Sequence, residues 1–75
     1  KALSINIRTV ESNIAKDLGK IQKKYLKYVD IGSYPFFKLG VVGVAVVIRS
    51  SNKVKLLNCK KDIIKLINFK KIKYF

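Results

Sequence analysis

The stretch VVGVAVVIRS, residues 41–50, decides the fold of this 75-residue chain. Its even positions from 42 to 48 are valine or isoleucine, and its odd positions from 41 to 47 are Val, Gly, Ala and Val. A strand that is apolar on both faces is typical of the centre of a sheet. We therefore predict a central strand over residues 41–50, with the bulkier even-numbered set facing the helices.

Two other segments read as strands. Residues 1–8 alternate apolar and polar side chains, which is the period-two pattern of a half-buried strand. Residues 28–34 are predicted to form another strand, with Val29 and Ile31 on one face. Since Pro35 cannot donate to a sheet ladder, we expect it to end that strand, and we expect residues 35–40 to connect it to the central strand.

A first helix is predicted from Glu11 to Leu26, capped by Thr9 or Ser12. Gly19 in its middle costs about 1 kcal/mol relative to alanine, which suggests a close approach to a strand. The apolar side chains at helical spacing on this helix are Ile14, Leu18, Ile21 and Tyr25.

A second helix is predicted to follow the central strand, capped by Ser51 or Asn52 and ending near Lys71. Its apolar side chains at helical spacing are Leu56, Cys59, Ile63 and Ile67. The order β-α-β-β-α predicts a single α+β domain over residues 1–75, a two-layer sandwich. Its three-stranded sheet has the strand order 2-3-1, with both helices on one face.

The sheet face away from the helices, with Gly43, Ala45 and Val47, is predicted to be too apolar to suit water. The candidate interface is this face together with the aromatic corner of Tyr34, Phe36 and Phe37. Three interpretations of the aromatic residues stay open. They fold back over the helix ends as core, they dock on a partner, or they contact a ligand directly.

The formal charge of +13 comes from 17 basic residues, of which only Arg8 and Arg49 are arginine. Phosphate and base recognition favours the planar guanidinium group, so mostly solvated lysine surfaces are expected. We predict at most weak, sequence-independent binding to nucleic acid that falls with salt.

The residue types give no basis for catalysis, and we predict no catalytic, cofactor-binding or metal-binding residues. The chain has no histidine, one cysteine and four scattered carboxylates. Cys59 has no histidine to activate it, and we expect it to be a small buried apolar residue. One cysteine forms no internal disulfide, which favours the reducing cytoplasm. The apolar run over residues 41–48 is too short to span a membrane, which takes about 20 residues.

The stretch ESNIAKDLGKIQKKYLKYVDIGSYPFFKLGVVGVAVVIRSSN, residues 11–52, resembles the C-terminal part of the competence/damage-inducible, molybdopterin-binding-like proteins. The motif Gly32-Ser33-Tyr34-Pro35 is the most specific part of this resemblance. Related segments follow the nucleotide-binding-like core of that family and of some FAD synthetase proteins. The resemblance implies a small accessory domain with a KH-like fold.

By this resemblance the chain is a non-catalytic accessory and association domain, the C-terminal fragment of a longer protein. By the same resemblance, the nucleotide pyrophosphatase residues of the family lie in its nucleotide-binding core. That core is absent from these 75 residues. The implied partners are this missing molybdopterin-binding-like domain or a second copy of the chain. The alternative is a lysine-rich, KH-like nucleic-acid-binding module, although no Gly-x-x-Gly loop of the kind that clamps a nucleotide backbone is present.

Overall fold

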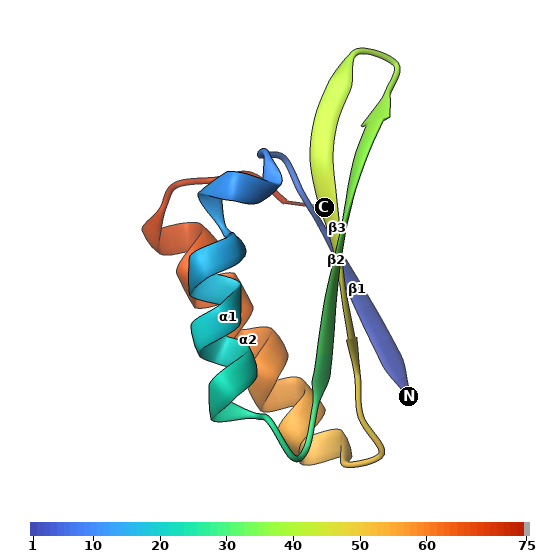
Figure 1. Cartoon of the computed structure of the whole chain (residues 1–75), viewed down its shortest axis with the longest axis vertical. Coiled ribbons are helices and arrows are strands. Elements are labelled where there is room, and N and C mark those ends of the chain that lie inside the picture. Colours follow the sequence, from blue (N-terminus) through green and yellow to red (C-terminus); the bar gives the residue numbers. More distant parts are fainter. Residues whose placement is uncertain (75) are drawn as a thin grey trace.

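The computed structural model describes residues 1–74, which form a three-stranded antiparallel sheet with two helices on one face (Figure 1). The elements are β1 (Ala2–Ile7), a 3-10 turn η1 (Glu11–Asn13), α1 (Ala15–Lys24), β2 (Asp30–Lys38), β3 (Val41–Arg49) and α2 (Lys53–Phe69). The strand order is β1-β3-β2. The predicted α+β fold, the central strand and the order of the strands are confirmed.

The core lies between the helices and the inner face of the sheet. Val44, Val46 and Ile48 of β3 are completely buried, because they alternate towards the helices from the central strand. Val42 continues the same alternation, but 47% of it is exposed. The β2–β3 hairpin extends past the end of the helical layer, so the inner face is uncovered at its tip (Figure 1).

Pro35 does not end β2, and that prediction was wrong. The strand continues to Lys38, and Pro35 pairs with Val44 in the register. The Ile31 backbone nitrogen donates to the Gln22 side chain instead of to β3, so this N–H points to the free edge of β2. Pro35 lies four residues further along the strand, so its nitrogen points to the same free edge. A proline nitrogen on the outer edge leaves every bond to β3 intact, which explains why an edge strand tolerates it.

The hairpin turns at Leu39 and Gly40, whose φ angles of 51° and 77° are both positive. Two consecutive positive φ angles between paired strands are the geometry of a type I′ turn, which matches the twist of a tight hairpin. The predicted connection over residues 35–40 therefore shrinks to two residues. Leu39 has a positive φ angle, which is uncommon for residues other than glycine.

The first helix starts later than predicted, and neither predicted residue caps it. The segment begins as the turn η1, and α1 starts at Ala15 with no side-chain cap. The hydroxyl of Thr9 instead accepts a hydrogen bond of 2.9 Å from the Asn13 side chain. In α2, by contrast, the Asn52 side chain accepts from the Lys55 backbone nitrogen at 3.1 Å, as one of the two predicted caps.

The chain after α2 folds back against the sheet. The helix ends at Phe69, two residues before the predicted end, and the Ile72 nitrogen donates to the Ile67 carbonyl. The Arg8 nitrogen then donates to the Lys73 carbonyl at 2.9 Å. The end of the described chain thus covers one end of the free edge of β1.

Gly19 makes no close approach to a strand, contrary to the prediction. A Cβ at this position would have no atom within 4 Å. We expect Gly19→Ala to stabilise the chain by about 0.5–1 kcal/mol in urea unfolding, because alanine has the higher helix propensity and nothing obstructs it. The matched variant Gly40→Ala meets no atom either, but its φ of +77° strains any side chain. It should destabilise; an equal effect of the two substitutions would contradict this interpretation.

Candidate functional site

The sheet face away from the helices is not covered by any other element in residues 1–74. The strand register places Asn6, Ala45 and Tyr34 in one row across this face, and Ser4, Val47 and Gly32 in the next. The charged residues of this face lie towards the ends of the strands. We call Tyr34, Phe36, Gly43, Ala45 and Val47 the outer-face patch.

Aromatic rings of β2 fill the space above two glycines of the sheet. A Cβ at Gly43 would lie 2.4 Å from Cζ of Phe36 and 3.0 Å from the Ile7 carbonyl oxygen. A Cβ at Gly32 would lie 2.9 Å from the hydroxyl oxygen of Tyr34. Both rings therefore lie along their own sheet, and Gly43 is occupied by Phe36 instead of being open to a partner.

Phe37 lies on the other side of the hairpin from Phe36, because successive side chains of a strand point to opposite faces. It pairs with Val42 beyond the helices, and 71% of it is exposed. Leu39 at the turn is fully exposed. We call Phe37, Leu39 and Val42 the hairpin tip. Neither Phe36 nor Phe37 joins the core, so the interpretation that they fold over the helix ends is wrong.

Five of the six residues predicted for the interface thus share the outer face, and Phe37 projects from the opposite side. Leu39 and Val42 were not predicted to belong to the candidate surface. The signal for Leu39 was a leucine directly before a glycine in a hairpin turn, where polar residues are usual. That these residues form an interface stays a prediction.

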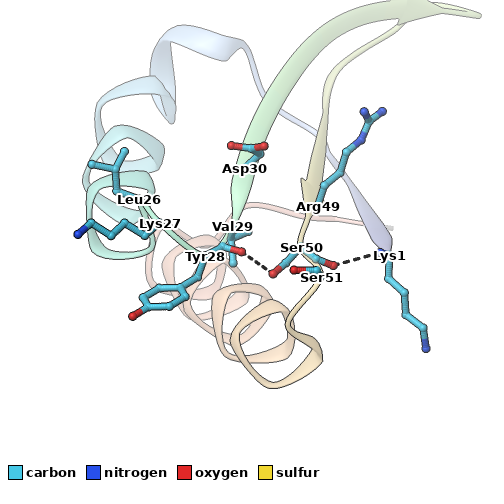
Figure 2. Close-up of a pocket in the computed structure, with 9 residues that line it drawn as sticks. All are labelled: Lys1, Leu26, Lys27, Tyr28, Val29, Asp30, Arg49, Ser50 and Ser51. Carbon is cyan, nitrogen blue, oxygen red and sulfur yellow. Dashed lines mark hydrogen bonds between the residues drawn. The ribbon is translucent and has the colours of Figure 1, made fainter.

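A pocket of about 400 Å³ lies at the end of the sheet near Ser50 (Figure 2). The Ser50 carbonyl accepts from the backbone nitrogen of Lys1 at 3.0 Å, and the Ser50 hydroxyl donates to the Tyr28 carbonyl. The cationic side chains around it, those of Lys1, Lys27 and Arg49, point away from one another in Figure 2. They do not converge on a common ligand position.

Asp62 is the centre of a polar cluster between the helices. Its Oδ2 atom accepts from the Tyr25 hydroxyl at 2.7 Å and from Lys24 Nζ at 3.0 Å. Burial by itself would raise the pKa of Asp62, but these two hydrogen bonds and the positive charges of Lys24 and Lys65 together outweigh it and lower the pKa. Burial and the bond to this carboxylate raise the pKa of Tyr25 to about 12.

Cys59 is completely buried, as predicted. Burial, together with the negative charge of Asp62, raises the pKa of its thiol to about 11. The thiol is therefore protonated near neutral pH, whereas a cysteine nucleophile must be present as the thiolate. Within residues 1–74, no three His, Cys, Asp or Glu side chains gather where they would hold a metal ion.

The cluster around Asp62 predicts a loss of stability in acid. Its folded-state pKa lies below the unfolded value of about 3.9, so its contribution is present above that value and is lost as the pH falls through the folded pKa. We expect Asp62→Asn to be less stable than the parent chain near neutral pH, and the difference to shrink at about pH 3. Urea unfolding at both pH values measures it. A difference that is the same at both would contradict the assignment.

The helices of the described chain are too short or too polar to cross a membrane. The family of FAD synthase middle domains matches residues 2–75. No curated protein and no solved structure matches the chain. A KH-like origin of the fold stays a prediction.

The family match corrects the predicted identity. The predicted membership of the competence/damage-inducible, molybdopterin-binding-like proteins is wrong, and so are the function and the molybdopterin-binding-like partner domain inferred from it. The motif Gly-Ser-Tyr-Pro was taken as evidence for that family, but the local packing of this strand accounts for its glycine and proline. Gly32 lies under the Tyr34 ring, and Pro35 lies on an outer edge. From residue 2 to its end, the chain belongs to the family of FAD synthase middle domains.

Proposed function

We propose that this chain is a non-catalytic domain that docks on a neighbouring part of an FAD synthase-type protein through the outer-face patch and the hairpin tip. The observation that carries the proposal is the pairing of an uncovered sheet face with a projecting hairpin whose Phe37 and Leu39 are exposed. The two surfaces face opposite sides of the hairpin, and each exposes apolar side chains of the kind that marks interaction sites.

The engagement of the acidic groups supports a non-catalytic role. Asp17 pairs with Lys70 at 3.0 Å, and Glu11 accepts from the Ser33 hydroxyl at 3.0 Å. Asp62 holds Tyr25 and Lys24, as described above. These three of the four carboxylates have structural partners, and the fourth, Asp30, is exposed at the start of β2, so the chemistry of FAD synthesis is assigned to other parts of the parent protein. An FAD synthase-type parent replaces the expected nucleotide pyrophosphatase, because the family match is to FAD synthase middle domains.

Physical chemistry favours docking through the sheet over docking through the helices. Aromatic side chains have a large apolar area to bury and little conformational entropy to lose, which makes them frequent anchors of interfaces. Most lysines lie on the helices and the following segment, on the far side of the sheet. A partner on the outer face therefore does not have to approach the densest positive charge.

The test uses an FAD synthase polypeptide that carries this domain between its neighbours. We expect Phe37→Glu to uncouple the domain, so that it unfolds in a separate calorimetric transition, because a buried charge without a partner is costly. The matched variant Leu26→Glu changes a residue of similar exposure, 68%, near the end of α1. It should leave the transitions unchanged.

Two results would overturn the proposal. One is an unchanged thermogram for Phe37→Glu in the parent polypeptide. The other is an equal effect of Leu26→Glu, because it would show that added charge alone destabilises the protein. Circular dichroism of both variants in the 75-residue chain verifies that each still folds.

A further inference from the structure

The outer flank of α2 carries a second apolar stripe that the core does not use. Its residues are Val54, Leu57 and Ile64, and Lys61 completes a spacing of three, four and three positions. This spacing is that of the a and d positions of a coiled-coil seam. Val54 is 66% exposed and Leu57 is 43% exposed, while Ile64 packs partly against the core.

The stripe lies in an open, shallow groove of about 560 Å³ whose lining residues all belong to α2. Val54, Leu57 and Ile64 lie on the side of the helix away from α1, because Asp62 and Leu66 on the other flank meet α1, and Lys65 borders both sides. From Val54 to Lys65 the helix rises about 16 Å, or three turns. The groove is thus long enough for about three turns of one more helix.

The charges along the groove have one sign. Lys60 and Lys65 flank the stripe, and Lys61 interrupts it in the middle. The one carboxylate of α2, Asp62, is already bonded to Lys24 and Tyr25 on the other flank. A helix in this groove would therefore meet positive charge on both of its sides and at one position of its seam.

We propose that this groove binds an acidic amphipathic helix, with apolar side chains over Val54, Leu57 and Ile64 and a carboxylate opposite Lys61. Complementary charge at flanking and seam positions selects coiled-coil partners. A second copy of this chain does not fit, because its groove would set lysine against lysine. The surface is separate from the outer-face patch, so this proposal stands independently of the proposed function.

The test uses the 75-residue chain and two synthetic helical peptides of about three heptads. The acidic peptide has leucine at its seam, glutamate on its flanks and one glutamate opposite Lys61. The basic peptide carries lysine at all those glutamate positions. Fluorescence anisotropy should show binding of the acidic peptide alone.

Substitutions then locate the binding. We expect Leu57→Gln to weaken the acidic peptide about tenfold, since it removes a central anchor. Lys61→Glu should weaken it about tenfold and should restore binding to a peptide whose single seam glutamate is replaced by lysine. Lys16→Glu on α1 is the matched control with the same change of net charge, and it should have a much smaller effect. Val54→Gln is a second seam variant in case Leu57→Gln perturbs the helix.

Several results would overturn the proposal. One is that the acidic peptide does not bind. Another is that Lys16→Glu weakens the binding as much as Lys61→Glu, which would show diffuse electrostatic attraction. Seam variants that keep full affinity would exclude the groove. Binding to vesicles containing phosphatidylserine that is lost in Leu57→Gln, without any peptide binding, would assign the groove to an anionic membrane surface.

Discussion

Replacing Ile48 by alanine is expected to unfold most of the chain at room temperature. Ile48 lies on the central strand, is completely buried, and faces the helices between β1 and β2. An isoleucine-to-alanine change at such a site costs about 2–5 kcal/mol, from lost burial and the cavity that remains. A single core of this size rarely supplies more than about 3–5 kcal/mol.

Val47→Ala is the matched control for this prediction. Val47 is the neighbour of Ile48 on the same strand, but it faces the outer side and is half-buried. Its truncation should leave a cooperative transition with only a modest loss of stability. Urea unfolding followed by circular dichroism measures both. A loss below about 1 kcal/mol for Ile48→Ala would show that the core is not where the structure puts it.

Gly43→Val is expected to produce the second largest loss, because the space above Gly43 is already occupied. Its added Cβ would lie 2.4 Å from the Phe36 ring, and the Ile7 carbonyl at 3.0 Å limits any shift of the strand. Overpacking of this kind costs about 1–3 kcal/mol, and a rigid backbone neighbour favours the upper end.

A double-mutant cycle separates this clash from a general effect of losing glycine. Phe36→Ala removes the ring, so Gly43→Val should cost less in that background than in the parent chain. The free energies of unfolding from urea titrations give the coupling. Additive effects of the two substitutions would show that Phe36 does not cover Gly43.

The features predicted well from the sequence are those in which the repeat of apolar residues along a strand or helix indicates directly which side is buried. Alternation from Val44 to Ile48 placed the core face of β3, and the helical spacing of Leu56, Cys59 and Ile63 placed the buried side of α2. The burial of these residues follows from the spacing of apolar side chains within their own segment. Their environment can be inferred without knowing which distant segment covers them.

The features that were missed depend on contacts between distant segments. Whether Pro35 breaks a strand depends on the edge that its nitrogen faces, and this follows only from the register with β3. A glycine does not say what lies above it, so the close approach of Gly19 to a strand was predicted wrongly, and the Phe36 ring over Gly43 was not predicted. Extending β2 through Pro35 would have placed Phe36 and Phe37 on opposite faces by parity alone.

The central claim is that the outer face and the hairpin tip are covered in an FAD synthase-type protein, and cysteine labelling tests it most directly. Single cysteines are introduced as Phe37→Cys and Leu26→Cys, both at exposed positions. The native Cys59 is fully buried and its thiol is protonated near neutral pH, so it should stay silent towards maleimide.

Both variants should label rapidly in the 75-residue chain. In the polypeptide that carries the neighbouring domains, Phe37→Cys should label more slowly by about tenfold or more, while Leu26→Cys keeps its rate. Equal labelling rates of Phe37→Cys in the isolated chain and in the longer polypeptide would contradict the claim.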